Sequence, residues 1–342
     1  MVSLPVVWSD DCLLHDPRNE IFVGVRMPTT EVPARLDAIR TALSDATFVE
    51  ARPHGDAPVL AVHDAELLEY LAASWDAWLA AGLPDDPGQH RVVPYVFPHG
   101  ALAGTATPAA VWARPGRFCY DTMTPIGPKT WTAARAAVDV ALTATELVSD
   151  GSTAAYACTR PPGHHAGTCS YGGSCYLNNA AVAAQALCER FGDVAVIDID
   201  AHHGNGTQEI FRGRDDVMTG SIHVDPGAGW FPHFVGFAVE NDESNRNLPL
   251  PPGTDDAAWL RAIEELVEWV TGAAALVVAL GVDAAASDPE SPLDVSPEGF
   301  SEAGRMLASL ALPTVFVQEG GYDLAALGGL VRDTLLGFEA AR

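Results

Sequence analysis

Short apolar runs alternate along the chain with longer segments of helical periodicity. Runs rich in β-branched and aliphatic residues, typical of strands buried on both faces of a sheet, cover 59–63, 153–159, 194–199, 217–223, 275–282 and 314–318. Apolar residues spaced three to four apart predict helices over 31–44, 65–82, 129–149, 178–190, 256–272, 296–311 and 324–338.

The order of these elements predicts an α/β fold with an open, mainly parallel sheet and helices on both faces, because most strands are separated by a helix. No repeat and no linker rich in Gly, Ser or Pro divides the chain, so we expect a single domain over residues 1–342. Two segments rich in Pro, Gly and aromatic residues, 84–128 and 224–256, are predicted to be long loops that build a binding site or an interface.

Charge and composition narrow the class of protein. The net charge of −26 repels phosphate backbones, which argues against nucleic-acid binding and favours cationic substrates, although the acidity can also serve solubility alone. No run approaches the roughly 20 apolar residues that cross a bilayer, and the start of the chain lacks a signal-peptide pattern. We therefore expect a cytoplasmic protein without membrane contact. The six cysteines lack CxxC spacing and are expected to be reduced.

Polar side chains follow four of the predicted strands at their carboxyl ends, where parallel α/β sheets bind ligands. They are His164 and His165 after 153–159, Asp198, Asp200 and His202 at the end of 194–199, Asp283 after 275–282, and Tyr322 after 314–318. Asp200 and His202 lie two apart on an extended strand end, so both point to the same side, and Asp283 can supply a third ligand. Two carboxylates and one imidazole leave an open position, which is typical of a catalytic zinc site.

The other side chains at this edge supply what an amide hydrolase needs. A histidine can take a proton from water and pass one to the leaving amine, and a tyrosine hydroxyl can donate to the developing oxyanion. An Asp-x-His pair at a strand end can also be a simple capping pair, but the gathering of histidines and a tyrosine favours a metal site. Gly320 and Gly321 permit a close backbone approach with positive φ, or form an ordinary strand-to-helix turn.

Five segments together resemble the histone deacetylase superfamily. They are RPPGHHAG (160–167), GGSCYLNNAAVAAQAL (172–187), VIDIDAHHGNGTQEIF (196–211), LGVDAAASDP (280–289) and QEGGYD (318–323). The first and third are similar to its class II-type branch, and FPHFVGFAVE (231–240) is similar to the bacterial acetylpolyamine amidohydrolases. The resemblance implies an arginase-like parallel sheet of about eight strands.

The resemblance also implies residue roles. One zinc ion per subunit is held by Asp200, His202 and Asp283. His165 is the general base and acid, His164 is its electrostatic partner and Tyr322 donates to the oxyanion. Asp198 is expected to orient His164, and Asn205 is expected to meet His165 where some relatives carry an aspartate. Potassium is a further expected ligand, with a first site at Asp198, Asp200, His202, Ser221 and Ile222 and a second at Phe211, Arg214 and Val217.

The substrate-binding residues depart from the family pattern. Relatives place an aromatic residue where this chain has Ser174, while the opposite wall of the tunnel is expected to be Phe231. The carbonyl of Gly173 is expected to accept the substrate amide N–H, with Gly320 and Gly321 also near the substrate. Loss of one aromatic wall predicts a wider tunnel, or one filled by another residue such as Tyr171. Segment 112–125 has no clear match to the acidic residues with which polyamine-acting relatives meet a distal ammonium group. Met123 lies near the position where one would be expected, and Asp121 is a possible substitute.

Three substrate classes stay open: acetylated polyamines, acyl-lysine and small N-acyl amines. A binuclear, arginase-type ureohydrolase is a first alternative, but such sites continue Asp-x-His-x-Asp and this chain has Gly204 at the last position. A catalytically weak sensor of acylated ligands, or a scaffold, is a second alternative, although all the catalytic side chains are retained. The relatives also imply a homodimer formed through residues 84–128.

Overall fold

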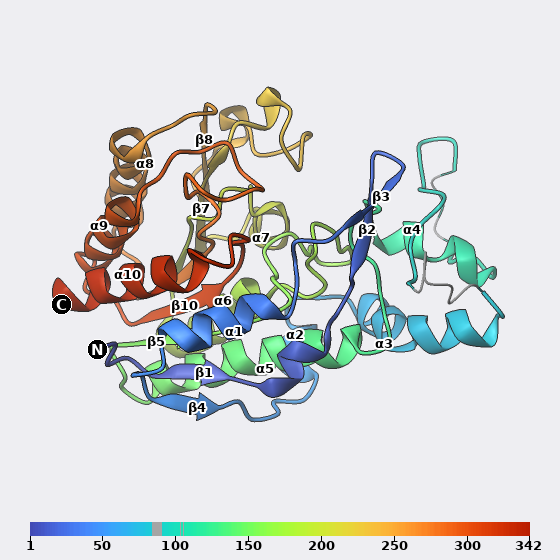
Figure 1. Cartoon of the computed structure of the whole chain (residues 1–342), viewed down its shortest axis with the longest axis horizontal. Coiled ribbons are helices and arrows are strands. Elements are labelled where there is room, and N and C mark those ends of the chain that lie inside the picture. The colour runs from blue at the N-terminus through green and yellow to red at the C-terminus, as the bar shows by residue number, and fades with distance from the viewer. Residues whose placement is uncertain (84–90, 103, 105) are drawn as a thin grey trace.

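The computed structural model describes residues 1–83, 91–102, 104 and 106–342. Within these residues, the centre of the molecule is an eight-stranded, wholly parallel sheet with the order β4-β1-β5-β10-β9-β6-β7-β8 (Figure 1). Its strands are β1 (Val6–Trp8), β4 (Phe48–Glu50), β5 (Ala154–Ala157), β6 (Val194–Asp198), β7 (Val217–Val224), β8 (Asn245–Leu250), β9 (Ala275–Leu280) and β10 (Thr314–Gln318). The predicted parallel sheet is confirmed.

Helices cover both faces of the sheet. They are α1 (Ala34–Ala42), α2 (Ala57–Leu60), α3 (Ala65–Ala80), α4 (Pro115–Phe118), α5 (Thr130–Ser149), α6 (Asn179–Phe191), α7 (Asn205–Phe211), α8 (Asp256–Trp269), α9 (Pro297–Ala308) and α10 (Leu327–Ala340). The helices α1, α10, α9 and α8 contact one another in a row, whereas α5 packs on α6 and both contact the inner strands. Every residue of β5, β6, β9 and β10 is buried as a result.

One predicted strand is wrong. Residues 59–63 belong to the end of α2 and the turn after it. Val59 and Val62 are the buried apolar residues of this run, and their spacing of three is helical. A short apolar run cannot be assigned to strand or helix from periodicity alone, and the flanking Pro58 suits the first turn of a helix.

The two predicted loops contain more structure than expected. Segment 224–256 includes β8, which forms one edge of the sheet, and the short 3₁₀ helices at Pro226–Ala228 and Ala238–Glu240. Segment 84–128 includes a 3₁₀ helix at Val111–Ala113 and α4, while residues 84–90, 103 and 105 lie outside the described part of the chain.

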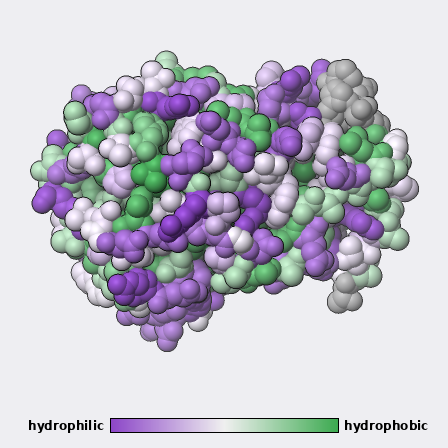
Figure 2. Space-filling view, turned by 90° about the horizontal axis from the view of Figure 1, so that it is seen from below, coloured by the Kyte–Doolittle hydropathy of each residue, from purple (hydrophilic) through white to green (hydrophobic). Residues whose placement is uncertain are grey.

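An antiparallel hairpin of β2 (Asn19–Phe22) and β3 (Val25–Pro28) projects from the sheet (Figure 1). At the other end, the two termini lie side by side, where Glu339 accepts a hydrogen bond from the backbone N of Ser3 at 2.8 Å. On the face drawn in Figure 2, hydrophilic and hydrophobic residues are interspersed. Among the described residues, no helix is both long and apolar enough to cross a membrane. All six cysteines are free, as expected.

Candidate metal centre and catalytic site

The order of the inner strands brings four sequence segments together. Strands β5, β10, β9 and β6 are neighbours in the sheet and run in the same direction, so the segments after them meet at one edge. The predicted ligands and catalytic residues follow these strands: His164 and His165 after β5, Asp200 and His202 after β6, Asp283 after β9, and Tyr322 after β10.

Asp200, His202 and Asp283 each offer one ligand atom, and these atoms lie within 4.8 Å of one another. The Nδ1 atom of His202 is 3.2 Å from Oδ1 of Asp200 and 3.0 Å from Oδ2 of Asp283. The second oxygens are engaged elsewhere: Asp200 Oδ2 accepts a hydrogen bond from Gly320 N at 2.7 Å, and Asp283 Oδ1 accepts one from Ala201 N at 2.8 Å. Two carboxylates and one imidazole nitrogen therefore converge, a donor set that fits zinc with an open position.

The charges in this cluster also fit a cation. Asp200 is 1% exposed and Asp283 is 0% exposed. Burial and the neighbouring Asp200 carboxylate raise the pKa of the Asp283 carboxyl to about 7. Buried carboxylates are stable when they are paired or when they coordinate a metal. A divalent cation bound between Asp200, His202 and Asp283 would therefore offset the repulsion between the two carboxylates.

Two glycines let the backbone pass close to these ligands. A Cβ atom at Gly320 would lie 2.3 Å from Oδ2 of Asp283, and one at Gly281 would lie 2.1 Å from Oδ2 of Asp200. Gly321 has a φ of +123°, which disfavours other residues. Gly320 thus lets the backbone pass close to the carboxylates of Asp200 and Asp283, and Gly321 forms a turn with positive φ after β10.

Each of the two adjacent histidines has a different partner. His164 Nδ1 lies 2.8 Å from Oδ2 of Asp198, and His165 Nδ1 lies 2.7 Å from Oδ1 of Asn205. The two contacts expected from the sequence are therefore present. The two imidazole rings are 4.1 Å apart between centroids, so the charge of one bears directly on the other.

These partners drive the pKa values of the two histidines apart. Burial by itself favours neutral rings, but the carboxylates of Asp198 and Asp200 raise the pKa of His164 to about 10. Burial, together with the positive charges of His164 and His202, holds the pKa of His165 well below its usual value. At neutral pH, His164 is therefore a cation and His165 a neutral base, a division that suits proton transfer.

Tyr322 is positioned by two charged residues that the sequence analysis did not single out. Its backbone N donates to Oδ2 of Asp288 at 2.6 Å. Arg35 Nε donates to the carbonyl oxygen of Gly321 at 2.7 Å, and Arg35 Cζ lies 4.7 Å from the centre of the Tyr322 ring. Burial raises the pKa of the Tyr322 hydroxyl well above its usual value, although Arg35 opposes this. The hydroxyl stays protonated and can act as a donor.

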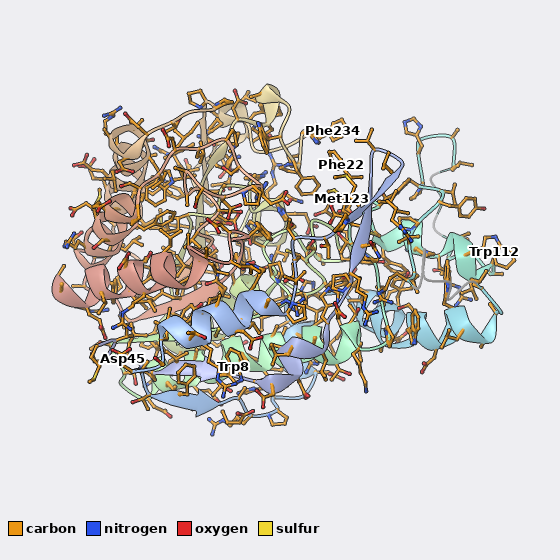
Figure 3. The ribbon with its side chains drawn as sticks, in the orientation of Figure 1. Trp8, Phe22, Asp45, Trp112, Met123 and Phe234 are labelled. Carbon is orange, nitrogen blue, oxygen red and sulfur yellow. The ribbon has the colours of Figure 1, made fainter. Side chains whose placement is uncertain are left out.

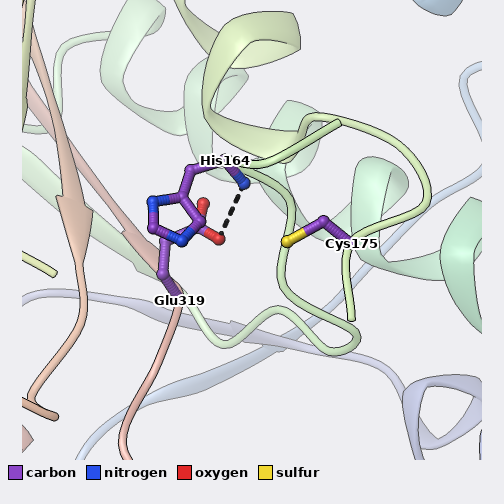
Figure 4. A group of neighbouring side chains, drawn as sticks. All are labelled: His164, Cys175 and Glu319. Atoms are coloured by element: carbon purple, nitrogen blue, oxygen red, sulfur yellow. Dashed lines mark hydrogen bonds between the residues drawn. The ribbon is translucent and has the colours of Figure 1, made fainter. Parts of the chain in front are cut away.

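Glu319 connects the segment carrying Tyr322 to the histidine loop (Figure 4). Its Oε2 atom accepts hydrogen bonds from the backbone N of Gly163 at 2.6 Å and of His164 at 3.1 Å. Ligand atoms of His164, Cys175 and Glu319 also lie within 4.8 Å of one another. Because Oε2 holds the histidine loop and His164 Nδ1 bonds Asp198, we interpret this group as a positioning contact. Glu319 lies within the QEGGYD segment, but the sequence analysis assigned it no role.

The loop carrying Gly173 and Ser174 is held by Asp121. Gly173 and Ser174 have φ values of +56° and +63°, and Asp121 Oδ2 accepts a hydrogen bond from Gly173 N at 2.6 Å. Asp121 Oδ1 accepts from the backbone N of Met123 at 2.8 Å and of Thr124 at 2.9 Å. Both oxygens therefore serve the protein's own backbone, which leaves Asp121 poorly suited to meet a distal ammonium group.

Tyr171 does not fill the place of the missing aromatic wall. The Tyr171 side chain is 0% exposed and stacks in the core between Tyr70 and Tyr176, with ring centroids at 6.2 and 5.6 Å. This expectation was wrong, because a ring that is fully buried among other aromatic side chains is not available to line a substrate tunnel.

Phe231 lies beside the general-base candidate, and Tyr120 lies beside Phe231. The Phe231 ring is 4.9 Å from the His165 ring in an edge-on arrangement. Tyr120 stacks on Phe231 with centroids 6.3 Å apart, and its hydroxyl donates to the carbonyl oxygen of His165 at 2.9 Å. The sequence analysis did not single out Tyr120.

The residues expected around monovalent cations are neighbours in the structure. Asp198 pairs with Ser221 across β6 and β7, and Oδ1 of Asp198 accepts from the backbone N of Asp200 at 3.1 Å. At the second position, Arg214 N donates to the carbonyl oxygen of Phe211 at 3.0 Å just before β7 begins. Occupation of either position by potassium stays a prediction.

Comparison with known proteins identifies the family. Residues 29–337 match the histone deacetylase domain family. The chain belongs to the histone deacetylase family. Within this family, it is 38% identical to acetylpolyamine amidohydrolase 1 of Pseudomonas aeruginosa over 98% of this chain and 99% of that protein. It is 41% identical to the acetylpolyamine amidohydrolase of Burkholderia pseudomallei over 97% of this chain and 98% of that protein.

Solved structures of the histone deacetylase family match the fold. The crystal structure of acetylpolyamine aminohydrolase from Burkholderia pseudomallei superposes with a TM-score of 0.91 at 39% identity and covers 99% of both chains. The HDA15 HD domain superposes with a TM-score of 0.78 at 25% identity, covering 99% of this chain and 90% of that one. The expected deacetylase-like fold is thereby confirmed.

Proposed function

We propose that the chain is a zinc-dependent amidohydrolase that removes an acetyl or other acyl group from an amine. The observation that carries this proposal is the convergence of Asp200, His202 and Asp283 at the sheet edge that also carries a neutral histidine, whose ring is 6.1 Å from that of His202, and a protonated tyrosine. The 38–41% identity to acetylpolyamine amidohydrolases over nearly the whole chain supports the same reaction class.

Each group at the site has a defined task in amide hydrolysis. A zinc ion held by Asp200, His202 and Asp283 would act as a Lewis acid toward the amide carbonyl and toward water. His165, neutral at pH 7, takes a proton from the attacking water and passes one to the leaving amine. The Tyr322 hydroxyl donates to the carbonyl oxygen as negative charge develops on it.

His164 and the two carboxylates around it support these steps without exchanging protons at neutral pH. Its pKa of about 10 keeps the imidazolium charged beside Asp198. That fixed positive charge lowers the pKa of His165 and stabilises the anionic transition state. Glu319 holds the backbone of the histidine loop, so both rings keep their orientation.

A binuclear arginase-type site is less well supported. Such a site needs a further carboxylate at the position of Gly204. A Cβ atom there would lie 2.2 Å from Oδ2 of Asp198, so a larger side chain does not fit. The donor set around His202 therefore favours one metal ion.

The reaction is tested with purified protein loaded with zinc. We expect release of the free amine from N-acylated amides, loss of this activity with a chelator and recovery when zinc is returned. A panel of acetylated polyamines, acyl-lysine peptides and small N-acyl amines covers the open substrate classes. No turnover of any member would favour an acyl-ligand sensor, and metal-dependent release of urea from a guanidinium substrate would favour a ureohydrolase.

Replacing Asn205 by Asp should move the pH profile. His165 must be neutral to act as a base, so activity falls as the pH drops through its pKa. A carboxylate 2.7 Å from Nδ1 favours the imidazolium and raises that pKa, so the acidic limb of kcat/KM should move upward by about one pH unit or more. Asn205→Ala removes the contact without adding charge and should not move the limb upward. An unchanged limb in Asn205→Asp would contradict this assignment of the base.

The homodimer expected through residues 84–128 and the potassium ions belong to the same proposal. Sedimentation of the purified chain tests the dimer, since a monomer at all concentrations would exclude it. Potassium is tested by comparing activity in potassium and in a bulky organic cation of equal ionic strength.

A further inference from the structure

A groove of about 500 Å³ opens beside the catalytic residues. One side is the hairpin of β2 and β3, and the other is the segment after β7. Figure 3 labels Phe22, Met123 and Phe234 near its rim. The groove is lined mainly by apolar side chains, among them Phe22, Tyr120, Met123, Phe231 and Phe234.

The groove is continuous with the proposed reaction centre. Tyr120, Asn205 and Phe231 all line it, and all three contact His165. Because His165 passes a proton to the leaving amine, that nitrogen lies beside the His165 ring, at the end of the groove formed by these residues. The part of the substrate attached to the nitrogen therefore extends into the groove.

The chemistry of the groove does not suit a long polycation. Among the described residues that line it, Asp121 is the one acidic side chain, and both its oxygens accept hydrogen bonds from backbone N–H groups. Glu20, on the same hairpin, is not part of the lining. A distal ammonium group placed here would lose water without gaining a free carboxylate, which is costly.

Flat apolar groups suit the groove much better. Phe22 is 49% exposed and Phe234 is 89% exposed, so both keep apolar surface available to a ligand. A ring attached to the amine can bury its faces against these aromatic side chains.

We propose that this groove binds a ring-bearing, apolar amine portion, so that the preferred substrates are N-acylated arylalkylamines rather than acetylated polyamines. This inference rests on the proposed amidohydrolase function. Hydrolysis breaks the C–N bond of the amide and forms a C–O bond with water, and both protons of that water end on the nitrogen, which already carries one hydrogen. The products are acetate and an arylalkylammonium ion.

The test compares kcat/KM for N-acetyltryptamine with kcat/KM for N-acetylputrescine, using zinc-loaded full-length protein. We expect a ratio of at least tenfold in favour of the aromatic substrate, equivalent to about 1.4 kcal/mol. Met123→Glu places a carboxylate in the groove and should lower this ratio at least tenfold. Met27→Glu adds the same charge at a 44% exposed position of β3 that does not line the groove, and should leave the ratio unchanged.

Each alternative gives a distinct result. A wild-type ratio near one, or a preference for N-acetylputrescine, would overturn the inference and leave the amidohydrolase function intact. Absence of hydrolysis of both substrates, and of the wider amide panel, would overturn the function as well. If Phe234→Ser converts a dimer to a monomer and leaves the substrate ratio unchanged, the groove is a surface for a second copy of the chain instead.

Discussion

Asp283→Asn is expected to abolish zinc retention and reduce amide hydrolysis to near background. The substitution keeps the size of the side chain, and its remaining carbonyl oxygen can still accept the hydrogen bond from Ala201 N. It removes the charged oxygen, Oδ2, which lies 3.0 Å from His202 Nδ1 and is the atom expected to bind zinc. Loss of a ligand should weaken zinc binding by more than the roughly 10–100-fold that loss of a supporting contact costs.

Zinc content after dialysis and kcat/KM for N-acetylated amides measure this effect together. The urea midpoint of the metal-free variant should stay near that of the metal-free wild type, which separates loss of metal from loss of fold. Asp37→Asn removes an exposed carboxylate on α1 and serves as the matched control. Full zinc occupancy and wild-type activity in Asp283→Asn would place the metal elsewhere.

The central strands of the sheet could be predicted because each of them is a continuous apolar run in the sequence. Runs such as 194–199 and 275–282 are continuously apolar, since β6 and β9 are buried on both faces. The edge strands β4 and β8 are not continuous apolar runs. Strand β4 has three residues, two of them exposed, and β8 begins Asn-Arg-Asn, so their pairing depends on neighbours distant in sequence.

Site residues that follow a strand recognisable in the sequence were predicted, whereas site residues positioned by contacts distant in sequence were missed. Asp200 and His202 directly follow a recognisable strand, so the sheet topology places them at its carboxyl edge. Arg35 and Asp288 come from a helix and a loop, and both act by holding backbone groups around Tyr322. Contacts to backbone atoms impose no pattern on the partner's sequence, so a single sequence cannot reveal them.

Tyr322→Phe is expected to lower kcat by about 10²–10³-fold, equivalent to roughly 2.7–4 kcal/mol, with little change in KM. The phenylalanine ring keeps the contact with Arg35, and its backbone N keeps the bond to Asp288, so only the hydroxyl is lost. Because this donor acts mainly on the charge that develops in the transition state, substrate affinity should change little.

The expected pattern for Tyr322→Phe distinguishes an oxyanion donor from a structural tyrosine. Zinc content should equal that of the wild type, because the proposed ligands Asp200, His202 and Asp283 are unchanged. Tyr95→Phe, at a 69% exposed position, should retain full activity. A structural role would instead lower stability or raise KM. A fall in kcat of less than about threefold, or a fall that coincides with loss of zinc, would remove Tyr322 from the chemistry and leave His165 and the metal to account for the reaction.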